Sequence, residues 1–453
     1  MKKKILIIGS GGREHAIGWK ISQSPKCGQI FFAPGNAGTA QLGTNVNIKA
    51  TDVLALADFA EKNRVDFTVV GPDDSLALGV VDEFQKRNLK IWGASKGASQ
   101  IEWSKAFSKK LMEDNNIPTA KYKTFTDYEE ALKYTEQEGA PIVIKASGLA
   151  LGKGVTICKT LNEAKKFLEN VMVNKIFGDS GNQVVIEEFL EGQEFSAHAF
   201  CDGQNFKILP PSQDHKTIFD GDMGPNTGGM GTIAPLPWVS DTMINKVASD
   251  IVKPALEGLK NLGAPFVGLL YPGLMASFPP LIRRGIEGEV AVKTIEYNSR
   301  FGDPETQSYM RLLKTDLFDI LNACVDGNLD EINIEWEKKF ACCIVLASGG
   351  YPEKYEKGLP ITGIEEASKL EDIVIFHAGT ATSPALRAPS PHEGRDGERL
   401  LTNGGRVLGI TATADTLQTA LKKAYSAIKL IHFEGMHYRT DIGAKSLPPP
   451  PLP

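Results

Sequence analysis

The chain has 453 residues, enough for about three domains at roughly 150 residues each. Its formal net charge of −5 gives no overall positive field, which disfavours nucleic acid or an anionic membrane surface as a partner. Apolar residues make up 42% of the sequence, yet no apolar run approaches the roughly 18 residues that cross a bilayer. We therefore expect a globular, cytoplasmic protein whose six cysteines, which show no CxxC spacing, are reduced core residues.

Strand-like and helix-like patterns alternate through the first hundred residues. Apolar runs and helical periodicity predict strands at 5–8, 30–33, 67–70 and 91–92, and helices at 13–24, 52–63 and 74–88. This alternation is typical of an open parallel sheet with helices on both faces. The glycine-rich turns 9–12, 34–38 and 71–74 each follow a strand, so they should meet at the carboxyl edge of the sheet, where α/β folds bind ligands.

Beyond residue 93 the pattern becomes a mixture of α and β elements. We expect a compact α+β unit at about 122–190, a larger segment to about 326, and a last segment from about 340. Two proline-rich stretches, 383–399 and 448–453, should be solvated surface segments. The expected helices are 96–115, 127–137, 161–173, 241–262, 304–313 and 415–431, and the expected strands are 122–125, 142–145, 155–158, 183–188, 341–346 and 407–412.

The turn at 9–12 is similar to a dinucleotide-binding fingerprint but lacks its last glycine, because Glu14 stands at that position. A nicotinamide site is therefore disfavoured. A phosphate held by the loop amides and Arg13 is one interpretation, and a tight turn without a ligand is the other.

Two stretches carry stronger chemical signals. Lys145 ends an apolar strand before a glycine-rich loop with Lys153, and such a loop is able to fold over a triphosphate; surface lysines on a hairpin are the alternative. Glu296 and Asn298 share one face of a predicted strand, so a carboxylate and an amide oxygen could bind a hard cation such as Mg²⁺. Arg300 should continue on that face and meet a phosphoryl group, unless the face is only solvated.

The polar stretches 184–191, 212–216 and 224–231 are less specific. Glu187 and Glu188 would suit the edge of a purine or could mark an ordinary strand exit. In isolation, His215 and Met230 would more often be structural, but their polar, glycine-rich surroundings favour a functional loop.

Taken together, these motifs resemble the glycinamide ribonucleotide synthetase (phosphoribosylamine–glycine ligase) family of the ATP-grasp superfamily. The resemblance extends over about residues 4–443. It is carried by GSGGREHA (9–16), PGNAGT (34–39), SKAFSK (104–109), PIVIKASGLALGKGV (141–155), IEEFLEGQEFS (186–196), SQDHK (212–216), GPNTGGMG (224–231), EYNSRFGDPETQ (296–307), ASGGYP (347–352), FHAGT (376–380) and TNGGRVLGIT (402–411).

The resemblance implies a domain order and a reaction. The domains would be an N-terminal sheet domain at 1–103, an ATP-grasp core at 104–330 with a small lid at about 122–190, a mixed α/β C-terminal domain at 331–443 with an insertion at 383–399, and a tail at 444–453. The reaction would join glycine to 5-phosphoribosylamine through glycyl phosphate, using ATP and Mg²⁺ or Mn²⁺. We expect no nucleic-acid or membrane partner, and a monomer or weak dimer.

The resemblance also implies roles for individual residues. Arg300, Asp214, His215 and Lys216 would face the acyl phosphate, and Glu296 and Asn298 would bind the metal. The nucleotide would be held by Lys105, Lys145, Gly148, Gly152, Lys153, Gly154, Glu187, Glu188, Phe189, Leu190 and Glu194. The phosphoribosylamine would be held by Gly11, Gly12, Arg13, Gly35, Asn36, Asp73, Gly228, Gly229, Met230, Gly231 and Asp303.

The sequence departs from the family pattern at a few positions. Ser147 stands where the family has an aspartate, and Asp73 where it has a glutamate. The loops at 279–288 and 383–399 are longer than usual. Two alternatives remain, namely another ATP-dependent carboxylate–amine ligase and a non-catalytic nucleotide-binding protein. The second has no need of the complete set Lys145, Glu296, Asn298 and Arg300.

Overall fold

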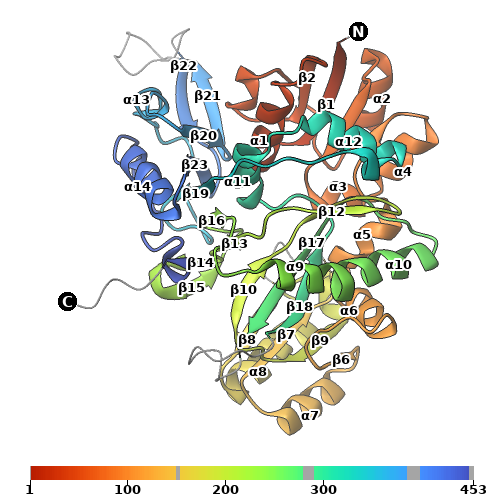
Figure 1. Ribbon diagram of the computed structural model, residues 1–453. Coiled ribbons are helices and arrows are strands. Elements are labelled where there is room, and N and C mark those ends of the chain that lie inside the picture. Colours follow the sequence, from red (N-terminus) through yellow and green to blue (C-terminus); the bar gives the residue numbers. More distant parts are fainter. Residues whose placement is uncertain (1, 149–153, 279–289, 385–397, 448–453) are drawn as a thin grey trace. The chain divides into compact units, whose positions relative to one another are not determined.

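The computed structural model describes residues 2–148, 154–278, 290–384 and 398–447 (Figure 1). The chain forms two compact units, each described here by itself. The first comprises Met1–Gly93, Pro210–Trp238 and Arg300–Pro453, and the second comprises Ala94–Leu209 and Val239–Ser299. Each unit is therefore assembled from separate stretches of sequence.

The N-terminal sheet of the first unit is parallel, as predicted. Its five strands lie in the order β3-β2-β1-β4-β5. These are β1 (Lys3–Gly9), β2 (Cys27–Pro34), β3 (Thr44–Asn45), β4 (Phe67–Val70) and β5 (Ile91–Trp92), with helices α1 (Gly12–Ile21), α2 (Val53–Asn63), α3 (Asp73–Ala77) and α4 (Val80–Lys86). The prediction of one helix over 74–88 is wrong, because Gly79 adopts a φ of 84° and separates α3 from α4.

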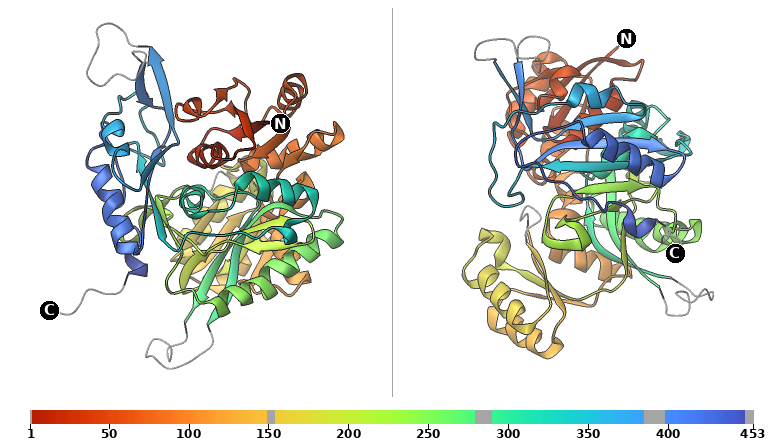
Figure 2. Two further views of the ribbon diagram at one scale, coloured as in Figure 1. Left: turned by 45° about the horizontal axis from the view of Figure 1, so that its top comes forward. Right: turned by 90° about the vertical axis from the view of Figure 1, so that its left-hand side faces the viewer.

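The second sheet of the first unit is antiparallel and has the order β13-β16-β19-β23-β20. Helices α14 and α11 pack on its opposite faces (Figures 1 and 2). The strands are β13 (Gln213–Asp214), β16 (Gly231–Ala234), β19 (Phe340–Ala347), β20 (Ile373–His377) and β23 (Arg406–Ala414), and the helices are α11 (Glu305–Leu312), α12 (Leu317–Asp326), α13 (Ile364–Ser368) and α14 (Leu417–Ile428).

Two short hairpins complete this unit. β14 (Thr217–Phe219) pairs with β15 (Met223–Asn226), and β21 (Thr380–Pro384) pairs with β22 (Glu398–Thr402). At the ends of the segment 383–399, which the sequence predicts to be solvated, Ser383 pairs with Arg399 in extended strands and Arg399 is exposed. Residues 385–397, the tail at 448–453 and the whole loop at 279–288 lie outside the described residues.

The second unit contains two further sheets. A four-stranded antiparallel sheet has the order β6-β9-β7-β8 and packs against α7 and α8. The other has the order β10-β17-β11-β12, with β18 paired along β17 (Figure 2). The strands are β6 (Tyr122–Phe125), β7 (Ile142–Ala146), β8 (Val155–Cys158), β9 (Val184–Glu188), β10 (Gln193–Ser196), β11 (Ala199–Asp202), β12 (Phe206–Ile208), β17 (Val267–Ser277) and β18 (Ala291–Asn298), and the helices are α5 (Lys96–Trp103), α6 (Lys105–Asp114), α7 (Tyr128–Glu138), α8 (Leu161–Leu168), α9 (Asp241–Val247) and α10 (Lys253–Asn261).

Three long helices expected in the second unit are interrupted. The segment 96–115 divides at Ser104, whose backbone is extended (φ −118°, ψ 101°) and whose hydroxyl caps α6 by accepting from the Phe107 amide. The segments 161–173 and 241–262 each contain a π-helical turn, at Glu169–Val173 and Ala248–Val252. An apolar period of 3.6 residues does not reveal such local changes in hydrogen bonding.

The remaining general expectations concern cysteine and membrane segments. All six cysteines are free thiols, and five of them are buried as predicted, whereas Cys27 is only partly buried. Among the described residues, no helix combines the length and apolar character needed to cross a membrane.

Three histidines of the first unit are buried in uncharged form. The His377 amide donates to His15 Nδ1 at 2.8 Å, which links α1 to β20. Burial, with a smaller contribution from His377, lowers the pKa of His15 to about 3, and burial lowers the pKa of His377 to about 4. Burial, assisted by Arg439, lowers the pKa of His215 to about 4.

These histidines predict a pH-dependent stability. Between about pH 6.5 and pH 4 the unfolded chain binds protons that the folded chain does not, so stability is full above pH 6.5 and is lost as the pH falls. The midpoint of urea unfolding should fall steeply between pH 7 and pH 5. His15→Gln should reduce that slope, whereas His432→Gln, at an exposed position, should not. A slope that is the same in His15→Gln as in the wild type would contradict this account.

Candidate active site

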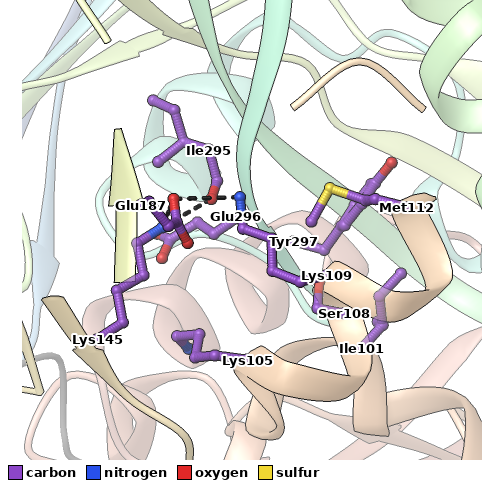
Figure 3. A pocket seen from close by; sticks show the side chains of 10 residues that line it. All are labelled: Ile101, Lys105, Ser108, Lys109, Met112, Lys145, Glu187, Ile295, Glu296 and Tyr297. Atoms are coloured by element: carbon purple, nitrogen blue, oxygen red, sulfur yellow. Dashed lines mark hydrogen bonds and ion pairs between the residues drawn. The ribbon is translucent and has the colours of Figure 1, made fainter. Parts of the chain in front are cut away.

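A buried carboxylate in the second unit is shared by two lysines. Glu187 Oε2 lies 3.1 Å from Lys109 Nζ and 3.0 Å from Lys145 Nζ, and all three side chains are 3% exposed (Figure 3). Lys145 Nζ also donates to the Ile295 carbonyl at 2.9 Å. Two positive charges and one negative charge leave this buried cluster with a net charge of +1, which suits an incoming anion.

The cluster follows directly from local structure. Lys145 on β7 is adjacent to β9, which carries Glu187, since Lys145 pairs with Val185 and Val143 pairs with Glu187. Lys105 and Lys109 are four residues apart on α6 and so lie on one side of that helix. Burial, partly offset by Glu187 and reinforced by Lys145, lowers the pKa of Lys109 to about 8.

A small cavity of about 10 Å³ lies beside this cluster (Figure 3). Its lining includes Lys105, Ser108 and Glu296 together with the two lysines and Glu187. Glu187 Oε1 and Ser108 Oγ are buried there and have no hydrogen-bond partner among the described residues. Unpaired polar atoms of this kind are costly to bury unless a ligand or water meets them.

The loop expected to cover a triphosphate is only partly described. Gly152 and Lys153 lie outside the described residues. At its two ends, the Ala146 amide donates to the Gly154 carbonyl at 2.8 Å, and a Cβ on Gly148 would lie 2.3 Å from Ser180 Oγ. The loop therefore begins at a position that only glycine fits.

Ser147, which replaces the family's aspartate, has a defined role here. Its hydroxyl accepts a hydrogen bond from the Ala106 amide at 3.1 Å. That amide belongs to the first turn of α6, where backbone donors have no partner within the helix. The substitution therefore keeps an acceptor at this helix start while removing a negative charge.

The residues expected to hold adenosine lie at the end of β9 and on β10. Glu188 is exposed, pairs with Lys293 at 2.7 Å and accepts from the Lys121 amide, and the Lys293 contact is the main reason that its pKa is lowered. Phe189, Leu190 and Glu194 are each partly buried.

Glu296 and Asn298 lie two residues apart on β18, as predicted. Their partners on β17 are Gly273 and Tyr271, and Asn298 Nδ2 lies 3.5 Å from the Tyr271 carbonyl. The described residues contain no group of three or more histidine, cysteine or acidic side chains that could hold a metal ion. The expectation that Arg300 continues this strand face is wrong, because β18 ends at Asn298.

In the first unit, Asp303 forms an ion pair with Arg406, and both side chains are mostly enclosed. Arg406 Nη2 lies 3.2 Å from Asp303 Oδ2, and Gln307 Nε2 donates to Oδ1 at 2.7 Å. Burial alone would raise the pKa of Asp303, but Arg406 and then Arg13 outweigh it and lower that pKa. Arg406 Nη1 also donates to the carbonyls of Gly228 and Asp303.

The first glycine-rich turn lies close to this ion pair. A Cβ on Gly12 would be 2.6 Å from Gln307 Nε2, and one on Gly11 would be 3.1 Å from Asp303 Oδ2. Gly229 has a φ of 104°, and a Cβ there would be 2.5 Å from Pro304. Glycine therefore allows three separate chain segments, at 11–12, 228–229 and 303–307, to approach one another.

Arg13 and Glu14 are more enclosed than the sequence predicts. Glu14 is 1% exposed and accepts from the Gly11 amide and from Arg13 Nε, both at 2.6 Å. Arg13 Nη1 donates to the Phe301 carbonyl at 3.0 Å. The amide of Gly11, which was expected to face a phosphate, is thus directed to Glu14.

The second glycine-rich turn is held by the side chain of Asn36. Its Nδ2 donates to the Ser10 and His377 carbonyls at 2.8 and 2.9 Å, and its Oδ1 accepts from the Gly38 amide. Gly35 has a φ of 75°. Asp73 is half-buried in the first turn of α3.

The polar loop around His215 divides into structural and accessible residues. The His215 ring lies 3.1 Å from the Gly231 carbonyl through Nδ1 and accepts from the Gly443 amide through Nε2 at 3.0 Å, so backbone groups occupy both nitrogens. Met230 is fully buried against Ile218 and Ala347, so its side chain is not available to a ligand. Asp214 and Lys216 are only partly buried.

Sequence reasoning assigned no role to Lys109, Arg406 or Glu14. All three stand inside the quoted motifs, but the sequence alone does not show that Glu14 and Lys109 are buried or that Arg406 forms an ion pair. The partners that hold them, such as Glu187 for Lys109 and Asp303 for Arg406, are distant in sequence.

The second unit combines two sheets with buried lysines on α6 and β7. This arrangement belongs to the ATP-grasp class of folds. Three family models match the chain: the N domain of phosphoribosylglycinamide synthetase at residues 3–102, its ATP-grasp (A) domain at 103–306 and its C domain at 341–445.

Individual relatives match this chain along almost their whole length. The chain is 45% identical to phosphoribosylamine–glycine ligase of Ralstonia nicotianae and 44% identical to that of Caldanaerobacter subterraneus, covering 98% and 97% of this chain and 99% of each relative. The crystal structure of phosphoribosylamine–glycine ligase from Thermotoga maritima is 34% identical with a TM-score of 0.79, covering 97% of this chain and 99% of that one. The chain belongs to the phosphoribosylglycinamide synthetase family, which confirms the resemblance seen in the sequence.

The position of His215 predicts how its replacement would act. Because both ring nitrogens bond to backbone and the ring stays neutral, His215→Asn should lower the melting temperature while kcat falls less than about tenfold. The pH dependence of kcat/KM should keep its shape between pH 6 and pH 9. Loss of one limb of that profile would instead identify His215 as a proton-transfer group.

Proposed function

We propose that this chain catalyses the reaction ATP + glycine + 5-phosphoribosylamine → ADP + phosphate + glycinamide ribonucleotide, the second step of de novo purine synthesis. Membership of the family over nearly the whole chain supports this proposal. The observation that carries it is the buried Lys109–Glu187–Lys145 cluster, whose excess positive charge suits the phosphates of ATP.

The nucleotide would be held by residues of the second unit. Lys105 and Lys145 would neutralise its phosphates, and the loop carrying Gly148, Gly152, Lys153 and Gly154 would close over them. Residues Glu187, Glu188, Phe189, Leu190 and Glu194 would surround adenosine, with Glu187 taking part through its backbone because its carboxylate is held by the two lysines. Lys145 needs only to exchange Glu187 for a phosphate oxygen to act in this way.

Glu296 and Asn298 fit a divalent metal that binds together with ATP. One carboxylate and one amide oxygen are too few for a closed protein cage but are typical of Mg²⁺ or Mn²⁺, which keep phosphate oxygens and water as their other ligands. When bound, such an ion would neutralise charge that develops on the phosphates. We propose Mg²⁺ or Mn²⁺ as the metal.

The chemistry proceeds in two displacements. A carboxylate oxygen of glycine attacks the γ-phosphorus, the bond to ADP breaks, and glycyl phosphate forms. The amine of phosphoribosylamine then attacks the acyl carbon, phosphate leaves with that carboxylate oxygen, and the amine loses a proton. The protein contributes positioning and charge, for which we propose Arg300, Asp214 and Lys216, with His215 supporting their loop.

The acceptor would be held by residues of the first unit. We propose the turns of Gly11 to Arg13 and Gly35 to Asn36, together with Asp73, Asp303 and the segment Gly228 to Gly231, where Met230 takes part through its backbone only. Arg406 adds a positive charge beside Gly228 and Asp303. We also propose a cytoplasmic enzyme, a monomer or weak dimer, with no nucleic-acid or membrane partner.

The metal assignment predicts the effect of one isosteric change. Glu296→Gln removes the charge and keeps the shape, so kcat at saturating ATP should fall at least about 100-fold, equivalent to about 2.7 kcal/mol. Glu257→Gln, which removes an exposed carboxylate on α10, should change kcat less than about twofold. A Glu296→Gln enzyme with the wild-type response to Mg²⁺ would exclude this residue as a ligand.

The identity of the acceptor is tested by omission. ADP release should require Mg²⁺, glycine and freshly prepared phosphoribosylamine together, and ribosylamine without its phosphate should support much slower release because it lacks a charge partner. Equal rates with ribosylamine or ammonia would reduce the assignment to a generic carboxylate–amine ligase. Nucleotide binding without ADP release would instead support the non-catalytic alternative.

A further inference from the structure

Lys109 is as buried as Lys145 in the Lys109–Glu187–Lys145 cluster, and the reaction proposed above gives it no contact with a substrate. Its Nζ donates to Thr119 Oγ1 at 2.7 Å, lies 3.1 Å from Glu187 Oε2 and faces the ring of Tyr122 at 5.5 Å from its centroid. Thr119 in turn donates to the Thr294 carbonyl at 2.7 Å. The ammonium is thus tied both to β9 and, through Thr119, to β18.

The two lysines of the cluster differ in how they are held. Lys145 contacts Glu187 and one backbone carbonyl, that of Ile295. Lys109 contacts the same carboxylate and a hydroxyl that is itself fixed. Glu187 Oε2 serves both lysines, while Oε1 has no partner among the described residues. The single negative charge of this carboxylate therefore neutralises only one of the two lysine charges.

We propose that Lys109 is a positioning residue that keeps Glu187 neutralised so that Lys145 is free to transfer from this carboxylate to the phosphates of ATP. This inference rests on the proposed function. With Lys109 present, the departure of Lys145 leaves a buried one-to-one ion pair. Without Lys109, the same departure would leave Glu187 as an isolated buried charge, which is strongly unfavourable. Lys145 would then stay on Glu187, and the cluster would carry no net charge.

Nucleotide binding tests this role without requiring turnover. Calorimetric titration with the magnesium complex of a non-hydrolysable ATP analogue should give a Kd at least about tenfold higher in Lys109→Met than in the wild type. Lys110→Met removes a neighbouring lysine of α6 that is 65% exposed and pairs with Asp114, and its Kd should stay within about twofold. At saturating ATP, kcat of Lys109→Met should fall much less than kcat/KM.

A double variant separates positioning from direct contact. In Lys109→Met/Glu187→Gln the carboxylate that retains Lys145 is also gone, so the Kd should be lower than in Lys109→Met alone. If Lys109 touched the phosphates itself, the second substitution would not restore binding. A double variant that binds no better than Lys109→Met overturns the proposal.

A milder pair of variants covers the case in which Lys109→Met does not fold. Thr119→Val removes the hydroxyl that anchors Lys109 and should raise the Kd for the analogue, whereas Thr119→Ser keeps the hydroxyl and should not. Equal Kd values for these two variants would count against the proposal.

The two proposals fail in different ways. If the wild-type chain binds the analogue and Lys109→Met weakens that binding, yet glycine and phosphoribosylamine elicit no ADP release, then the proposed reaction is wrong and the role of Lys109 stands. If turnover is as proposed and Lys109→Met binds the analogue as the wild type does, only the role of Lys109 is wrong.

Discussion

The proposed nucleotide site depends on one buried carboxylate that two lysines share. Removing three charged side chains from water is costly, and it is tolerated here because Lys109 Nζ and Lys145 Nζ lie 3.1 and 3.0 Å from Glu187 Oε2 and both lysines make further hydrogen bonds. The strands β7 and β9 and the helix α6 are arranged so that these side chains meet. The imbalance of one positive charge is what prepares the site for an anion.

In the first unit, several backbone segments that are distant in sequence lie close together. Glycines at 11, 12 and 229 lie so close to the segment 303–307 that a Cβ at these positions would crowd it. The Asp303–Arg406 ion pair also links these segments. Asn36 and His215 satisfy backbone groups of neighbouring loops. These loops therefore owe part of their shape to polar side chains that bond to backbone.

Much of this organisation was predictable from the sequence. The parallel sheet followed from its apolar runs, and the pairing of Glu296 with Asn298 on one face followed from the two-residue period of a strand. The breaks at Gly79 and Ser104 were not predictable from periodicity, because each depends on one residue's backbone angle. The structural role of His215 and the ion pairs of Lys109 and Arg406 depend on partners far away in sequence, which no local pattern identifies.

The central claim, that the phosphates of ATP activate a carboxylate for attack by an amine, has one direct test. Glycine carrying ¹⁸O in both carboxylate oxygens should be supplied with MgATP and phosphoribosylamine, and the inorganic phosphate should be analysed by mass spectrometry. One ¹⁸O atom should appear in each phosphate released, and the glycinamide ribonucleotide should retain the other. Release of unlabelled phosphate at the rate of product formation would show that no acyl phosphate forms and would contradict the account.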